Sequence, residues 1–346
     1  MTTTPWEEKA VTTATDGLTP PDHFGHPAAE RTAMQEKGVL LPFSPTVLIV
    51  VEGEDRVNFL SGLITNQIRK VTSSRAIYAG LLSAQGRFLY DFTIAEQGNS
   101  FVLLTDTKRA ASLLDRLDMY RLRSKVSLQR VTTSHLLAMA GPQVDEIIYS
   151  LFPQVSGQTE PGTVWQLSPT TLLWRDPRLP AYGWRLLTDE TELSGYYALL
   201  APHLPLAGQQ AWHDYRCQMA LPQGGYEWQV DETLPLEGGF LELNGVDFTK
   251  GCYIGQETTA RTHHRGTLRK RLFKLSMATP LTGVTLPAPL LLENGKEAGT
   301  LTTLASDGMS GLAIVRVSDV ANGEPVFCQN VGMSTQQPTW ATWQLN

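Results

Sequence analysis

The 346-residue sequence contains only three cysteines, Cys217, Cys252 and Cys328, and none of them forms a CxxC pair. Three scattered thiols are too few for the disulfide framework of a small secreted domain. This cysteine usage is typical of a protein that works in a reducing compartment.

No apolar stretch approaches the roughly 20 residues that a membrane-spanning helix needs. The segment from Val39 to Val51 is interrupted by Pro42 and Pro45. The first residues also lack the basic, apolar and small-residue succession of a secretory signal, and their acidic residues argue against a transit peptide. We therefore expect no membrane partner and a cytoplasmic location, or the mitochondrial matrix if the protein is eukaryotic.

Charged residues make up only 18% of the chain, and the formal net charge is -6. This balance gives no overall reason to expect nucleic acid or an anionic membrane as the main partner.

The sequence contains no GxGxxG, GxxxxGK[ST], HExxH or GxSxG motif. These absences exclude the common nucleotide-binding, metalloprotease and hydrolase classes. With 42% hydrophobic residues, a chain of this length is expected to form two or three packed units.

The pattern along the chain changes twice. Residues 1–38 are rich in Thr, Pro and Ala without a sustained apolar period, so we expect a poorly ordered N-terminal extension. From residue 39 to 265, short β-branched runs alternate with helical periods, which predicts two interleaved α+β units. Beyond Leu272, short strands separated by Pro and Gly are typical of a small β-barrel or sandwich. We assign residues 266–346 to this C-terminal β-barrel domain.

The residue types suited to chemistry are concentrated in Lys250-Gly251-Cys252-Tyr253-Ile254-Gly255-Gln256-Glu257. Its two glycines permit sharp backbone geometry and the close approach of a ligand or partner. A helix is expected to begin at Gln256, and both its N-terminus and Lys250 would stabilise a Cys252 thiolate. A lone intracellular cysteine is otherwise often a small buried apolar residue. The polar neighbours favour a reactive Cys252.

A basic stretch follows this cysteine, with no acidic residue between Glu257 and Glu293. It contains Arg261, Arg265, Arg269, Lys270, Arg271 and Lys274. In a net negative protein, it could hold the carboxylates of a folate tail, a nucleic-acid backbone or an acidic protein. The alternative is a solvated face. No standard ligand spacing surrounds His263-His264, so we expect no metal site there, and proton transfer or anion binding stays open for these histidines.

Two carboxylates stand in otherwise apolar sequence. Asp91 follows Gly86-Arg87 on the second strand of a predicted hairpin, and Glu237 lies within Leu-Pro-Leu-Glu-Gly-Gly. If both point into a common cavity, they could accept hydrogen bonds from the amino and ring N–H groups of a pterin. Taken singly, each is more commonly a surface or turn carboxylate.

The segment from Asn244 to Glu257, with its Arg-Thr-His-His continuation, resembles the YgfZ family, closest to the branch of the mitochondrial iron-sulfur assembly factor. Further ordered matches are Leu63-Ile64-Thr65-Asn66, Gly86-Arg87 through Asp91, Tyr120 through Val126, and Asp176-Pro177-Arg178 with Gly183-Trp184-Arg185. These proteins are similar in fold to the folate-dependent aminomethyltransferase of the glycine cleavage system. The resemblance implies an α+β, three-domain aminomethyltransferase-like fold around a central folate cavity.

The same resemblance implies a role in maturing 4Fe-4S proteins, with iron-sulfur assembly proteins and 4Fe-4S apoproteins as partners. It also implies tetrahydrofolate as cofactor and, in bacteria, a link to enzymes of tRNA modification. The Lys-Gly-Cys position implies Cys252 as the reactive residue, and the pterin-side carboxylate of the aminomethyltransferases implies Glu237. One cysteine cannot enclose a cluster, so a bound cluster would be transient and shared with a partner.

The site residues that we predict are therefore Cys252 as the reactive group and Asp91, Glu237, Lys250 and Arg261 as cofactor ligands. Whether the chain catalyses a reaction stays open, because the aminomethyltransferases have an aspartate where Cys252 stands and paired acids at Tyr90-Asp91. One alternative is an active one-carbon transferase in which Asp91 positions the folate nitrogen. Another is an accessory protein of tRNA modification that binds RNA through the basic stretch.

Overall fold

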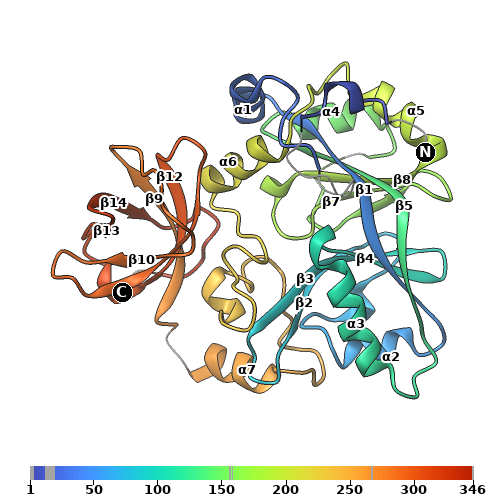
Figure 1. The fold of residues 1–346 in the computed structure, drawn as a ribbon. Coiled ribbons are helices and arrows are strands. Elements are labelled where there is room, and N and C mark those ends of the chain that lie inside the picture. Colours follow the sequence, from blue (N-terminus) through green and yellow to red (C-terminus); the bar gives the residue numbers. More distant parts are fainter. Residues whose placement is uncertain (1–3, 12–19, 156, 158, 266–267, 345–346) are drawn as a thin grey trace.

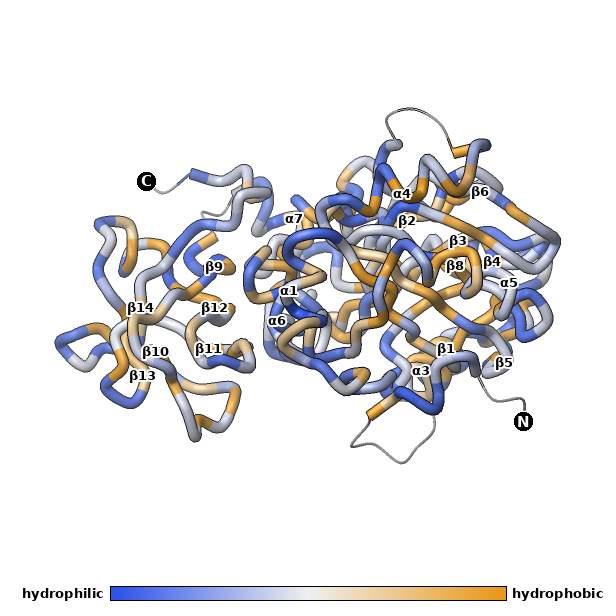
Figure 2. The backbone as a smooth tube through the Cα atoms, turned by 90° about the horizontal axis from the view of Figure 1, so that it is seen from above, coloured by the Kyte–Doolittle hydropathy of each residue, from blue (hydrophilic) through white to orange (hydrophobic). Residues whose placement is uncertain are grey.

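The computed structural model describes residues 4–11, 20–155, 157, 159–265 and 268–344. A mixed α/β region built on one eight-stranded sheet lies beside a closed C-terminal β-barrel (Figure 1). Seen from above, α1, α6 and α7 lie between the barrel and the sheet region (Figure 2). Within the described ranges, no helix has the length and apolar character needed to cross a membrane.

The sheet joins the two predicted α+β units into one layer, with the strand order β2-β3-β4-β1-β5-β8-β7-β6. Its strands are β1 (Val39–Glu52), β2 (Ile77–Leu82), β3 (Phe88–Gln97), β4 (Ser100–Leu104), β5 (Ser127–Ala140), β6 (Val164–Gln166), β7 (Leu172–Arg175) and β8 (Trp184–Asp189). All neighbouring strands are antiparallel. The long strands β1 and β5 pair along their whole lengths and so connect the two halves.

Helices pack on the sheet and between the sheet region and the barrel (Figure 2). They are α1 (Pro27–Glu36), α2 (Arg56–Ser61), α3 (Ala110–Arg121), α4 (Val144–Leu151), α5 (Glu190–Leu200), α6 (Gln209–Met219) and α7 (Gln256–Arg265). Short 3-10 helices are η1 (Glu7–Lys9), η2 (Ile68–Lys70), η3 (Thr107–Arg109), η4 (Pro180–Tyr182), η5 (Pro235–Gly238) and η6 (Val317–Asp319). On α3, Leu113 and Leu117 are fully buried against β1 and β5.

The N-terminal extension differs from the expectation of poor order. Trp6 is only 2% exposed, and its ring lies 5.4 Å from that of Tyr197. The α1 helix buries Met34, and the carboxylate of Glu30 accepts hydrogen bonds from three backbone N–H groups. The expectation is therefore wrong for the described residues 4–11 and 20–38, which are joined to distant parts of the chain by the contacts of Trp6 with Tyr197 and of Glu30 with Gly208. Residues 12–19 lie outside the described ranges.

The predicted C-terminal barrel is confirmed as a closed barrel with the order β10-β11-β12-β9-β14-β13. Its strands are β9 (Lys270–Met277), β10 (Ala288–Leu291), β11 (Glu297–Leu304), β12 (Ser310–Arg316), β13 (Val326–Cys328) and β14 (Val331–Gln336). The predicted domain boundary adjoins residues 266–267, which are not described. Buried polar contacts join the barrel to the rest of the chain: Glu227 accepts a hydrogen bond from Thr303, and Asp214 accepts one from the N–H of Ser306 at 2.7 Å.

Candidate functional site

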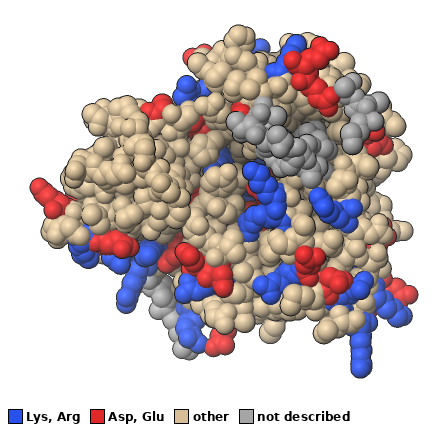
Figure 3. Space-filling model, viewed as in Figure 1, with Lys and Arg blue, Asp and Glu red and all other residues tan. Residues whose placement is uncertain are grey.

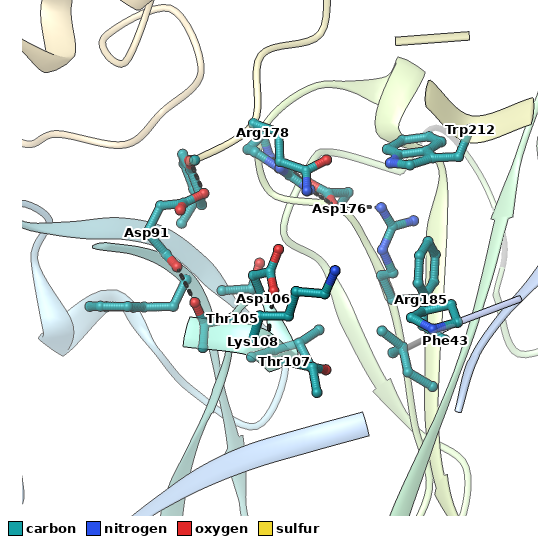
Figure 4. Close-up of a pocket in the computed structure, with 18 of the residues that line it drawn as sticks. Phe43, Asp91, Thr105, Asp106, Thr107, Lys108, Asp176, Arg178, Arg185 and Trp212 are labelled. Carbon is teal, nitrogen blue, oxygen red and sulfur yellow. Dashed lines mark hydrogen bonds and ion pairs between the residues drawn. The ribbon is translucent and has the colours of Figure 1, made fainter. Parts of the chain in front are cut away.

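A cavity of about 200 Å³ lies where the two halves of the sheet meet α6. Its wall comes from β1–β5, η3, α6, the segment 176–185 and the loop 223–226. The space-filling view shows a hollow in this face of the molecule, with Lys and Arg side chains gathered at it (Figure 3). In the close-up, Asp91 lies on one side of the cavity, and Asp176 and Arg185 lie on the other (Figure 4).

The first side of the cavity is centred on Asp91, whose side chain is 14% exposed. The Tyr78 hydroxyl donates a hydrogen bond of 2.8 Å to its Oδ2, and Arg109 Nη1 lies 3.6 Å from its Oδ1. Burial raises the pKa of Asp91, while the Arg109 charge opposes that rise. A Cβ on Gly224 would lie 2.0 Å from Oδ1. Only glycine therefore lets this backbone approach the carboxylate.

The second side is centred on Asp176, which is 1% exposed. Arg178 binds its carboxylate through two hydrogen bonds of 2.8 and 2.7 Å, and Arg185 Nη2 lies 3.4 Å away. Burial alone would raise the pKa of Asp176, but the two guanidinium groups hold it below its usual value. Burial also lowers the pKa of Arg185 to about 10, although Asp176 acts in the opposite direction.

These two sides give the cavity a polarity. The first side offers the Asp91 carboxylate, which can accept hydrogen bonds from N–H groups. The second side is the region in which Arg178 and Arg185 share Asp176. Between them, the wall is apolar and partly aromatic, with Phe43, Phe92, Leu104, Leu136 and Trp212. Such a site suits a planar, nitrogen-rich ring that carries an anionic group.

Cys252 lies on an exposed loop outside this cavity wall. The loop packs against the turn between β2 and β3, and one glycine on each side of this contact has positive φ. A Cβ on Gly255 (φ +80°) would meet Ser83 O at 2.5 Å, and one on Gly86 (φ +77°) would meet the β-carbon of Thr258 at 2.7 Å. The glycines thus permit a close contact between the cysteine loop and the hairpin, and β3 of that hairpin carries the aspartate of the cavity.

Lys250 holds the cysteine loop from inside. It is 5% exposed, and its ammonium donates hydrogen bonds to Ser61 O at 2.8 Å and to Ile64 O. Burial lowers the pKa of Lys250 to about 8. Its charge is therefore directed at carbonyl groups at the end of α2, and the side chain does not line the cavity that the structure describes.

Two asparagines connect the segment of the cysteine loop to the cavity wall. Asn66 Nδ2 donates hydrogen bonds of 2.8 Å to both Tyr78 O and Asn244 O. Asn244 Nδ2 in turn donates to Pro177 O at 3.1 Å and to Arg178 O at 3.2 Å. These hydrogen bonds therefore join segments that are far apart in the sequence: those of Asn66, Tyr78, Pro177-Arg178 and Asn244.

Glu237 and Arg261 occupy other parts of the molecule. Glu237 lies on η5, which packs against β9. Burial raises the pKa of Glu237, and Lys270 and Arg87 oppose that rise. Among the described residues of the cavity wall, Asp91 is present and Glu237 is not, because η5 faces the barrel. The two carboxylates therefore do not share this cavity, and the role of Glu237 as a cofactor ligand stays a prediction.

Two arginines of the basic stretch form ion pairs within the chain. Arg261 forms a 2.6 Å ion pair with Glu257 on the exposed surface of α7, and Arg271 lies 3.6 Å from Glu242. The side chain of Arg265 lies outside what the structure describes. His263 stacks on Phe248 at a centroid distance of 4.0 Å. Within the described part of the chain, no group of three His, Cys, Asp or Glu could hold a metal ion.

Sequence reasoning missed most residues of the cavity as functional groups. Asp176, Arg178 and Arg185 stood out only as part of a resemblance, and Tyr78 and Trp212 did not stand out at all. The one local signal was an Asp-Pro-Arg sequence next to a Gly-Trp-Arg sequence, which indicates a buried ion pair only when the two segments are known to face each other.

The fold is aminomethyltransferase-like. The model of the GCVT N-terminal domain matches residues 2–164, and that of the CAF17 C-terminal beta-barrel domain matches residues 269–343. The crystal structure of glycine cleavage system aminomethyltransferase T from Bartonella henselae has a TM-score of 0.81 over 97% of this chain and 95% of that chain. At 17% identity, this likeness shows the shared fold.

Relatives in sequence narrow the class. The mitochondrial iron-sulfur cluster assembly factor IBA57 of Mus musculus is 37% identical over 287 residues, which are 78% of this chain and 75% of the relative. The Homo sapiens factor is 33% identical over 284 residues, which are 78% and 74% of the two chains. The chain belongs to the IBA57 family of iron-sulfur cluster assembly factors, which confirms the resemblance noted in the sequence.

Proposed function

We propose that this protein is an assembly factor for 4Fe-4S proteins that binds a tetrahydrofolate beside Asp91 and presents the Cys252 thiol to partner proteins. The observation that carries the proposal is the exposed Cys252 on a loop that Lys250 fixes and that packs on the hairpin bearing Asp91. The names of the relatives support the iron-sulfur part of the proposal. The partners would be iron-sulfur assembly proteins and their apoprotein clients.

The cavity residues fit a reduced pterin. The Asp91 carboxylate can accept hydrogen bonds from amino and ring N–H groups, and the apolar wall can cover the faces of a flat ring. Burial raises the pKa of Asp91, which lets the group exchange a proton closer to neutral pH. When bound, a tetrahydrofolate supplies a reduced pteridine that can carry a one-carbon unit.

The thiol fits a role in handing over a cluster. Cys252 is the exposed cysteine, whereas Cys217 and Cys328 are buried. Iron-sulfur clusters are held by several thiolates, so one cysteine can supply only part of a ligand set. The remaining ligands would come from a partner, and a cluster on Cys252 would be transient cargo shared across the contact. In a eukaryote the site of this work would be the mitochondrial matrix, and in a bacterium the cytoplasm.

The test of this role compares Cys252→Ala with Cys328→Ala in cells from which the gene has been deleted. We expect the Cys328 variant to restore the activity of a 4Fe-4S enzyme and the Cys252 variant to leave it at the level of the deletion. Immunoblots would check that both proteins accumulate. Full restoration by Cys252→Ala would overturn the proposed role of the thiol.

The folate part has its own test, because Asp91 lies apart from the thiol. Calorimetric titration with 5-formyltetrahydrofolate should detect binding to the wild type, and Asp91→Asn should weaken it about tenfold, or about 1.4 kcal/mol. If purified Cys252→Ala turned over methylene-tetrahydrofolate with an amine acceptor and Asp91→Asn did not, the protein would instead be a one-carbon transferase.

A further inference from the structure

Arg109 and Lys108 are neighbouring cations at the cavity, and they differ in whether their charges have partners within the protein. Arg109 lies 3.6 Å from Asp91, donates a hydrogen bond to Leu89 O and covers the rings of Phe88 and Tyr90. Its charge therefore serves the protein's own structure. Lys108 is exposed and lines the cavity, and none of the residues that the structure describes forms an ion pair with its ammonium.

The position of Lys108 is fixed at its backbone. Asp106 caps η3, and its Oδ1 accepts the N–H of Lys108 at 2.8 Å. The hydroxyl of Thr105 donates a 2.8 Å hydrogen bond to Asp91 O, which ties the segment to β3. From this base, the Lys108 side chain extends across the cavity toward the side on which Asp176 and Arg185 lie (Figure 4).

That side has more positive than negative charge. Arg178 and Arg185 share the single carboxylate of Asp176. Arg185 Nη1 donates to two neutral acceptors, Tyr182 O at 2.7 Å and Trp184 O at 3.0 Å, and its nearest anion is 3.4 Å away. The lowered pKa of Arg185 agrees with a buried cation that its surroundings compensate only in part. A ligand anion would complete the compensation.

We propose that Lys108 and Arg185 form a subsite for the glutamate carboxylates of the ligand's tail, and that Lys108 selects folates over pterins without this tail. The inference rests on the proposed binding of tetrahydrofolate and adds the residue that reads its anionic end. The ligand then lies with its N–H groups at Asp91 and its carboxylates at Lys108. This assignment differs from the folate-tail role considered for the basic stretch after Cys252, in which Arg261 and Arg271 are paired within the chain.

Calorimetry with two ligands tests the subsite. One ligand is 5-formyltetrahydrofolate, and the other is 5-formyltetrahydropteroate, which lacks both glutamate carboxylates and keeps only a benzoate carboxylate nearer the ring. The wild type should bind the folate about tenfold more tightly than the pteroate, as one charge-assisted contact would give. Lys108→Met should abolish that difference by weakening only the folate. Lys108→Arg should retain it.

The matched control is Lys37→Met, which removes another exposed lysine, at the end of α1, without touching the cavity. It should leave both affinities unchanged, and thermal unfolding should show that Lys108→Met remains folded. If the wild type and Lys108→Met bind folate and pteroate alike, the subsite is wrong while folate binding stands. If the wild type binds neither ligand, both the subsite and the proposed folate binding are overturned.

Discussion

The cavity and the cysteine loop place their polar chemistry in opposite environments. In the cavity, Asp176 and Arg185 are buried, Arg178 is partly buried, and their charges depend on one another. In the loop, the Cys252 side chain is exposed and the backbone around it is tightly fixed. The charged residues of the cavity therefore also hold up the fold, whereas the thiol can be removed without structural cost.

The largest loss of stability should follow removal of the Asp176 carboxylate, which Arg178 and Arg185 share. Asp176→Ala leaves the buried Arg185 and the partly buried Arg178 without their shared anion, and we expect a loss of about 3–5 kcal/mol in the free energy of unfolding. Urea denaturation measures it. The control is Asp118→Ala, which breaks an exposed pair with Arg121 and should cost about 0–1 kcal/mol. Equal effects of the two variants would contradict the view that the cavity supports the fold.

The second largest loss of stability should come from strain in the backbone of the cysteine loop. Gly255→Ala forces a Cβ to within 2.5 Å of Ser83 O at φ +80°, and we expect it to cost about 1–3 kcal/mol. Gly251→Ala is the matched change, since no atom lies within 4 Å of its added Cβ, and it should stay within about 0.5 kcal/mol. Both variants keep the Cys252 thiol. Faster hydrogen exchange of the loop amides in Gly255→Ala than in Gly251→Ala would therefore report backbone strain and not loss of the thiol.

The pH dependence of Asp91 should be intermediate in size. Because burial raises the pKa of this carboxyl in the folded state above its ordinary value, the folded chain binds the proton more tightly than the unfolded chain. The contribution of Asp91 to stability is therefore fully present at low pH and falls as pH rises through the raised pKa. The unfolding free energy of the wild type minus that of Asp91→Asn should decrease between about pH 4 and pH 7. An increase over this range would contradict the assigned direction.

The smallest effect on stability should come from the thiol itself. Cys252→Ala should change the free energy of unfolding by no more than about 0.5 kcal/mol, whereas Cys217→Ala should cost about 1 kcal/mol because that side chain is fully buried.

Thiol labelling tests the same assignment. Burial raises the pKa of the Cys217 thiol to about 12, whereas Cys252 is exposed. A thiol reagent should therefore label Cys252 rapidly in the native protein. Rapid labelling that survives Cys252→Ala would show that the wrong thiol was assigned.

Local sequence patterns predicted the elements whose contacts are also local. The hairpin of β2 and β3 and the C-terminal barrel were both predicted from periodicity and turn residues. The N-terminal extension was misjudged because the ring contact of Trp6 is to Tyr197, far along the chain. The join of the two α+β units through β1 and β5 likewise depends on pairing between distant strands.

By itself, the sequence determined the family of this protein and the segment that carries Cys252, because glycines, a cysteine and polar neighbours at fixed spacing lie within a few residues. Only the tertiary structure decided which charges face each other. It placed Lys250 against carbonyl groups, separated Glu237 from Asp91, and brought Asp176, Arg185 and Lys108 to one cavity. The physical reason is that a buried charge is defined by its partner and its distance from water, and the folded chain fixes both.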